Sequence, residues 1–243
     1  MQPALRYPTT PPRKIAHKNQ NPKLIDTGKG PSPKGHFNMV GEHHSIEIRC
    51  LRESELQRAY EINKRYLDDG PFDKWAKACR EFPELCVACF REGKPIGICY
   101  GSPFSMRPGE VILDGIAVVE NFSGQGYGSQ LLRFFDQQIE HEGYEAVSLG
   151  SAGGYVEHFY MKNGYKPIEF AFWVPIDFDL SPELQAKYGI QDNPGEDGTR
   201  RLSVRIGSLD NALRNRLLAD FPVREIISIM YKRMSDYAAD QDE

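Results

Sequence analysis

The strongest constraint on the fold is a run of apolar residues that leads into a glycine-rich loop and then into an amphipathic helix. Residues 110–119 form a largely apolar strand pattern, three glycines follow within 124–128, and an apolar helix face continues through Leu131 and Ile139. Glycines let the backbone curl so that several N–H groups converge, and a helix N-terminus adds unpaired donors and a partial positive charge. The segment therefore predicts a pocket for a phosphate or pyrophosphate group.

The spacing of these glycines excludes two common nucleotide-binding loops. A Walker loop requires a lysine after its last glycine, and no lysine follows Gly128. The dinucleotide fingerprint requires a third glycine three positions after the second, where this chain has Ser129. The phosphate must belong to another class of ligand.

Two motifs in order identify that class. Ser123–Gly128 resembles motif A of the GNAT superfamily of acyl-CoA-dependent N-acyltransferases, [Arg/Gln]-x-x-Gly-x-[Gly/Ala], and Phe159–Tyr165 resembles its motif B, Phe-Tyr-x-x-x-Gly-Phe. The resemblance covers about residues 45–175, and residues 223–233 are similar to the closing strand of the family. It implies an α/β fold in which a mixed, mostly antiparallel β-sheet flanked by helices binds acyl-CoA.

The resemblance also implies how the donor, acetyl-CoA, is held without a metal. Backbone groups of Ala117 and Val118 would pair with the pantetheine arm. The pyrophosphate would be held by amides of the loop residues Gly124, Gln125, Gly126, Tyr127, Gly128 and Ser129. The chain departs from the family at Ser123, where arginine or glutamine is usual, and at Gly153, where asparagine is often found seven residues before the motif B tyrosine.

For the catalytic residues, the sequence leaves alternatives. The resemblance implies that Tyr160 protonates the departing thiolate, with a packing tyrosine as the alternative. The attacking amine must be neutral, so a carboxylate or a water chain has to accept a proton. Period-two parity puts Glu110, Ile112 and Asp114 on one strand face, and relatives carry a carboxylate at the position of Ile112. Asp114 or Glu110 is therefore the predicted base, against the alternative that both are solvated surface groups.

Periodicity predicts the elements around this segment. Strands are expected at 46–50, 84–91, 95–102, 146–149, 165–175 and 202–206, and helices at 53–69, 73–81, 126–142 and 154–163, with another beginning at an N-cap Ser208. Residues 223–231 fit strand or helix, and their β-branched run favours strand. Residues 177–199 are expected to be a loop, with a turn of helix at 182–188.

The net charge of −4 is a sum of unlike parts. Residues 1–44 carry seven cations, two anions and seven prolines, which predicts a flexible, basic, proline-rich arm, and the other residues carry 23 of the 30 cations and 32 of the 34 anions. We divide the chain into this arm, a GNAT-like domain at 45–235 with an insertion at about 177–221, and an acidic tail at 236–243. We do not expect nucleic acid as a partner. If the chain does bind nucleic acid, we expect the arm at 1–44 to make the contact.

We therefore expect an N-acetyltransferase that acts on a small-molecule or peptide amine. A non-catalytic acyl-CoA-binding regulator and an RNA- or ribosome-associated acetyltransferase tethered by the arm are the alternatives, and a homodimer is left open. No apolar run reaches the ~18 residues that a membrane span needs, and no secretory signal is recognised. Five cysteines, an odd number, favour reduced thiols and a cytoplasmic location.

Overall fold

The computed structural model describes residues 46–67, 70–105, 107–194 and 198–235. The expected basic arm at 1–44 and the acidic tail at 236–243 lie outside these residues. Our division of the chain therefore stays a prediction.

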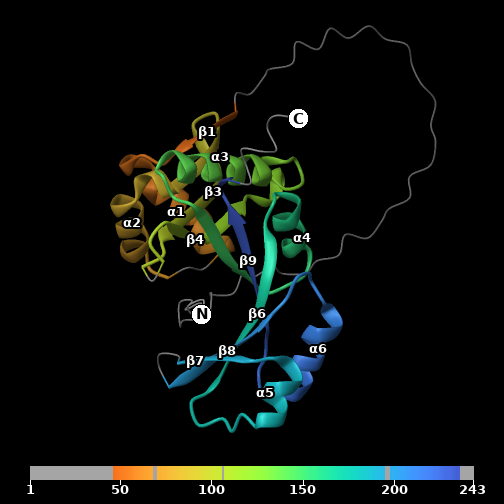
Figure 1. Ribbon diagram of the computed structural model, residues 1–243. Helices are drawn as coiled ribbons and strands as arrows, with labels where there is room; N and C mark the ends of the chain where they lie inside the picture. The colour runs from red at the N-terminus through yellow and green to blue at the C-terminus, as the bar shows by residue number, and fades with distance from the viewer. Residues whose placement is uncertain (1–45, 68–69, 106, 195–197, 236–243) are drawn as a thin grey trace, which may run out of the picture.

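One mixed sheet runs through the described part of the chain, in the strand order β1-β2-β3-β4-β5-β9-β6-β8-β7 (Figure 1). The strands are β1 (Ile46–Cys50), β2 (Cys86–Arg91), β3 (Lys94–Pro103), β4 (Glu110–Val118), β5 (Ala146–Ser151), β6 (Lys166–Pro175), β7 (Gln191–Pro194), β8 (Thr199–Arg205) and β9 (Ile227–Arg233). The α-helices are α1 (Leu56–Tyr66), α2 (Phe72–Glu81), α3 (Tyr127–His141), α4 (Tyr155–Lys162), α5 (Pro182–Tyr188) and α6 (Asn211–Asp220). Every strand pair is antiparallel except β4 with β5, so the predicted fold class is confirmed.

Helices cover both faces of the N-terminal half of the sheet. Trp75 of α2 and the buried apolar residues of α1 pack with Ile98 and Tyr100 on one face. Leu131 and Phe135 of α3 pack with β2, β4 and β5 on the other face. α5 and α6 pack with β6 and β8 around a separate apolar cluster. None of the described helices is both long and apolar enough to cross a bilayer.

The parallel pair β4 and β5 separates after three residues. Pairing joins Glu110–Ile112 to Ala146–Ser148, after which β4 continues to Val118 and β5 to Ser151. β3 stays paired with β4 as far as Val118. The β5-facing edge of residues 113–118 consequently has no partner strand in the described part of the chain, and the two strands open toward the glycine loop.

Two local predictions were wrong. Residues 191–194, expected in a loop, form β7, because their pairing with β8 is decided by a distant strand and not by their own polar sequence. Helix α6 begins after Asp210, not Ser208, since the Asp210 carboxylate accepts the N–H of Leu213 at 2.9 Å. The helix turn at 182–188 and the strand favoured at 223–231 are both present, the latter as Ile227–Arg233.

A buried ion pair attaches α3 to the centre of the sheet. Asp136 of α3 accepts from Lys232 Nζ of β9 at 2.8 Å and from the Tyr165 hydroxyl at 2.9 Å. The Lys232 ammonium also donates to the Asn163 carbonyl at 3.0 Å, at the end of α4. Burial raises the pKa of Asp136, although Lys232 and Tyr165 act against that shift. The network fixes the two helices that border the opening between β4 and β5.

Lys232→Met is expected to lower the free energy of unfolding by about 3 kcal/mol at neutral pH, since it leaves the Asp136 carboxylate buried without its cation. A carboxyl whose folded-state pKa is raised destabilises the fold only when it is ionised. The deficit should therefore shrink on acidification toward about pH 4. Urea denaturation at several pH values measures both effects. Arg80→Met, which breaks the exposed pair with Glu53, is the control and should change nothing measurable; an equal loss in both variants would contradict the prediction.

Candidate active site

The glycine loop ends in an open helix N-terminus. Gly124 and Gly126 have φ values of +75° and +86°, which favour glycine, and Gly126 is the N-cap of α3 without a side-chain cap. The first intrahelical bond runs from Gln130 N to the Gly126 carbonyl at 3.1 Å. The amides of residues 127–129 therefore have no acceptor within the helix. This end of α3 suits an anion, as the sequence predicts.

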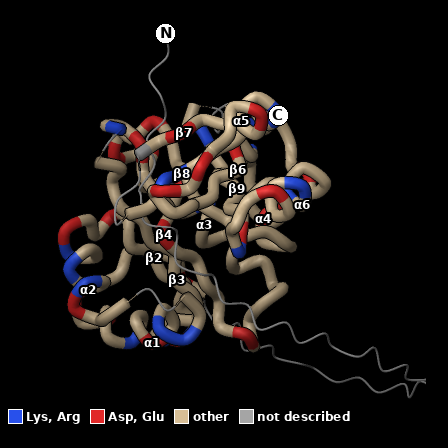
Figure 2. Tube along the Cα trace, turned by 90° about the horizontal axis from the view of Figure 1, so that it is seen from below, with Lys and Arg blue, Asp and Glu red and all other residues tan. Residues whose placement is uncertain are grey.

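Local charge does not oppose a phosphate at this position. The first turn of α3 contains no acidic residue. Charged residues of both signs are instead spread along α1, α2 and α6 (Figure 2). The attraction for phosphate rests on the backbone donors and the positive end of the helix.

Three elements meet around Gly128. A Cβ placed on Gly128 would lie 3.4 Å from Cε2 of Phe159 on α4 and 3.9 Å from Cγ2 of Val118 at the end of β4. The predicted phosphate loop, the predicted pantetheine strand and the helix with motif B thus come together. A glycine at 128 keeps the space between them free of a side chain.

The end of β4 offers a backbone donor on the open side. The N–H of Val119 bonds to the Ile96 carbonyl of β3 at 2.8 Å. Successive N–H groups of an extended strand point to opposite edges, so the N–H of Val118 points away from β3. This is the edge where β5 has separated. By the same alternation, the backbone groups of Ala117 face β3, where Ala117 pairs with Ile98, so the predicted use of Ala117 by the pantetheine arm does not fit this strand end. Its side chain packs with the α1–α2 cluster.

Tyr160 lies inside the apolar cluster under α3 and α4. Its side chain is 2% exposed, and its ring contacts Phe159 and Tyr165 at centroid distances of 5.3 and 5.7 Å. No described residue hydrogen-bonds to its hydroxyl. Burial raises the pKa of Tyr160 well above that of a free tyrosine. The group is therefore protonated at neutral pH and able to donate.

The two candidate carboxylates have different surroundings. Asp114 is exposed and accepts from Ser102 Oγ at 2.8 Å. It is the extra residue of a β-bulge, because Tyr100 pairs with Gly115 and Gly101 pairs with Leu113. The simple period-two alternation is therefore interrupted at Asp114, although its carboxylate still reaches Ser102, which pairs with Ile112.

Glu110 stands at the other end of β4. Its side chain is buried, with Oε2 at 3.0 Å from Arg107 and Oε1 without a partner in the described part of the chain. The structure thus does not bring Glu110 and Asp114 into one carboxylate pair. Asp114 lies on the sheet face away from Tyr160, so an acid and a base would stand on opposite sides of the opening between β4 and β5.

Two Arg–Glu pairs, one buried and one partly buried, are not predicted from the sequence. Arg214 of α6 bonds to Glu157 of α4, and Arg201 of β8 bonds to Glu169 of β6. Burial raises the pKa of Glu169, and the arginine acts against that shift. Each pair joins residues that are distant in the chain, so no local pattern signals them.

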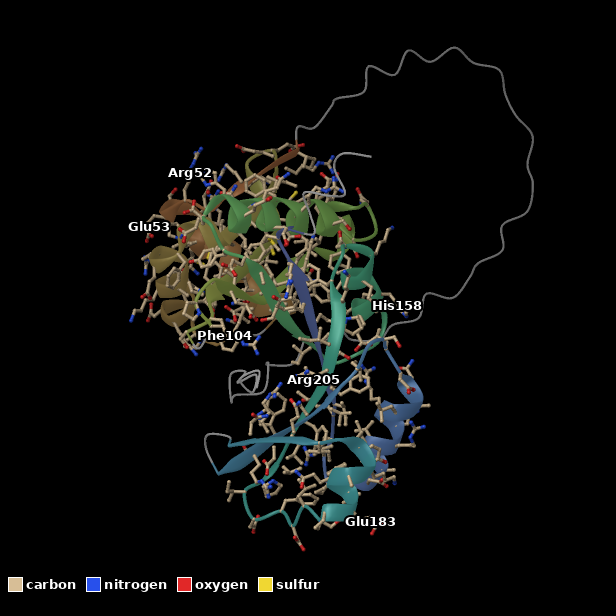
Figure 3. All side chains as sticks on the ribbon, viewed as in Figure 1. Arg52, Glu53, Phe104, His158, Glu183 and Arg205 are labelled. Atoms are coloured by element: carbon tan, nitrogen blue, oxygen red, sulfur yellow. The ribbon has the colours of Figure 1, made fainter. Side chains whose placement is uncertain are left out.

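The described residues contain no group of three or more His, Cys, Asp or Glu side chains placed to hold a metal ion. His158 is exposed on the outer side of α4 (Figure 3). It is two positions from Tyr160 and therefore lies on a different face of the helix.

Comparisons with known proteins agree with the motifs. Residues 46–165 match the model of the acetyltransferase (GNAT) family. No curated protein matches the sequence. Among solved structures, the chain is similar to Ard1 from Thermoplasma volcanium, at 20% identity and a TM-score of 0.47, covering 68% of this chain and 99% of that one.

Two other solved structures are similar over comparable lengths. The ribosomal-protein-S18-alanine N-acetyltransferase from Escherichia coli has 17% identity and a TM-score of 0.49, covering 78% of this chain and 94% of that one. A GNAT family acetyltransferase from Brucella melitensis in complex with acetyl-CoA has 22% identity and a TM-score of 0.42, covering 51% of this chain and 84% of that one.

Proposed function

Since the chain belongs to the acetyltransferase (GNAT) family through residues 46–165 and is therefore an acyltransferase, we propose that it moves an acetyl group from acetyl-CoA to a primary amine. The amine attacks the thioester directly. The acceptor is a small-molecule or peptide amine. The free thiols of all five cysteines suit a reducing compartment such as the cytoplasm.

The observation that carries the proposal is the meeting of the α3 N-terminus, the end of β4 and α4 around Gly128. The diphosphate of the donor binds the loop amides from Gly124 to Ser129. The pantetheine arm follows the unpaired edge of β4 at Val118, as an extended ligand adds to a sheet edge. This path directs the thioester toward the point where β4 and β5 separate.

The chemical step then needs one donor and one acceptor of protons. The N–H of Val118 polarises the thioester carbonyl, where negative charge develops. Asp114 accepts the proton of the amine through water, with Glu110 as the alternative base. Tyr160 gives its proton to the CoA thiolate as the C–S bond breaks. The new bond is an amide, and free CoA leaves.

The proposal is tested by calorimetry with acetyl-CoA followed by a thiol-release screen against an amine library. Binding of acetyl-CoA together with thiol release by an amine supports it. Binding without turnover of any amine would favour the alternative of an acyl-CoA-binding regulator. Loss of RNA binding or of activity on deletion of residues 1–44 would favour the tethered alternative.

Asp114→Asn is expected to lower kcat about ten-fold with the acetyl-CoA affinity unchanged, because asparagine cannot accept the amine proton but still bonds to Ser102. Asp114 is exposed, so folding should be unaffected. Glu110→Gln is the matched comparison and should mainly reduce stability through its pair with Arg107. Steady-state kinetics and thermal melts separate the two. If Glu110→Gln instead lowered kcat and Asp114→Asn did not, Glu110 would be the base.

A further inference from the structure

Helix α6 reaches α4, which borders the proposed donor site, through one side chain. We call α5, β7, β8 and α6 the C-terminal lobe. Arg214 of α6 extends from this lobe to α4, where it bonds to Glu157, and to β9, where it bonds to Ser228. Its guanidinium lies 4.8 Å from the ring centroid of Phe170. With a side chain only 12% exposed, Arg214 is enclosed between the lobe and α4.

The guanidinium also fills a space at the turn between β5 and α4. A Cβ on Gly153 would lie 3.1 Å from Arg214 Nη1, and Gly153 has a φ of +107°. The contacts of this nitrogen to Glu157 Oε2 and Asn211 Oδ1 are both long, at 3.3 Å. A side chain at position 153 would displace the arginine. The glycine that departs from the family pattern is thus matched by an arginine from a distant helix.

Glu157, which bonds to Arg214, and Tyr160, the proposed acid, lie on one side of α4. Glu157 and Tyr160 are three positions apart, which brings them to one helix face, and both are buried. Next to them, Phe159 faces Gly128 at the phosphate loop. The rotation of α4 therefore determines both the place of the Tyr160 hydroxyl and the distance between α4 and the end of β4.

We propose that Arg214 is a positioning residue through which the C-terminal lobe holds α4 and the β5–α4 turn at the distance that the acyl arm of the donor requires. The inference rests on the proposed function, because it assigns the space between α4 and β4 to that arm. Arg214 acts through Glu157 and Gly153 and does not itself touch the phosphate loop. Its removal should affect the pantetheine part of the donor and spare the nucleotide part.

The test compares two ligands by calorimetry: acetyl-CoA and adenosine 3′,5′-bisphosphate, which lacks the pantetheine arm. Arg214→Met should raise the Kd of acetyl-CoA about ten-fold, because small displacements of binding groups are costly, and leave that of the bisphosphate within about two-fold. Arg214→Lys should recover part of the affinity. Arg216→Ala, an exposed arginine of the same helix, is the matched control and should alter neither ligand.

If Arg214→Met fails to fold, Glu157→Gln tests the same contact by changing its partner on α4. It should raise the Kd of acetyl-CoA and leave that of the bisphosphate unchanged. When Glu157→Gln is combined with Arg214→Lys, the double variant should bind acetyl-CoA at least as tightly as the more weakly binding of the two single variants. Equal weakening of both ligands, or no change in either, would overturn the positioning role and leave the proposed function standing. Failure of the unaltered protein to bind acetyl-CoA would overturn the proposed function and this inference together.

Discussion

Tyr160→Phe is expected to lower kcat at least about ten-fold and to leave the acetyl-CoA affinity within about two-fold. The buried ring should keep its contacts with Phe159 and Tyr165, since only an oxygen is removed. That oxygen is not bonded to any described residue, so its loss leaves no buried partner unsatisfied. The effect should therefore fall on the protonation of the departing thiolate and not on folding.

Tyr165→Phe is the matched control for this prediction. Tyr165 is also a buried tyrosine, but its hydroxyl is already used by Asp136 at 2.9 Å. The control should lose stability and keep its turnover. Burial raises the pKa of Tyr160, so turnover should not fall near pH 10, where an ordinary tyrosine ionises. A normal rate for Tyr160→Phe, measured by thiol release, would remove the general-acid role.

The sequence predicts the strand, the glycine loop and the helix of the candidate donor site well because their signals are local. The strand expected at 110–119 is present as Glu110–Val118, and the helix expected at 126–142 as Tyr127–His141. Positive φ values at Gly124 and Gly126 follow from the glycines themselves. Each of these features depends on neighbours within a few residues, which a single sequence displays.

The acceptor side depends on contacts that a single sequence does not display. The bulge at Asp114 arises from the pairing of β4 with β3, so parity alone could not show that Asp114 is exposed while Glu110 is buried beside Arg107. Arg214 and Glu157 are separated by 57 positions. Their pairing required the C-terminal lobe to be placed against α4. Residues of this kind are found only once the sheet order is known.

Gly128→Val is expected to weaken acetyl-CoA binding about a hundred-fold, which corresponds to about 3 kcal/mol. The Cβ position at Gly128 already lies at contact distance from Phe159, so the two γ-carbons of valine must enter the space between α3, α4 and Val118. Gly128 is helical with no positive φ, and valine is no worse than glycine in a helix. The substitution should therefore block the donor without unfolding the chain.

Two companion variants make this prediction specific. Gly128→Ala adds only the Cβ, at 3.4 Å from Phe159, and should bind acetyl-CoA nearly normally with a higher melting temperature. Gln130→Val puts the same β-branched residue on the exposed side of the first turns of α3 and should leave binding intact. Calorimetry and thermal melts on all three give the comparison. If Gly128→Val bound acetyl-CoA as tightly as Gly128→Ala, the space around Gly128 would not be the path of the donor.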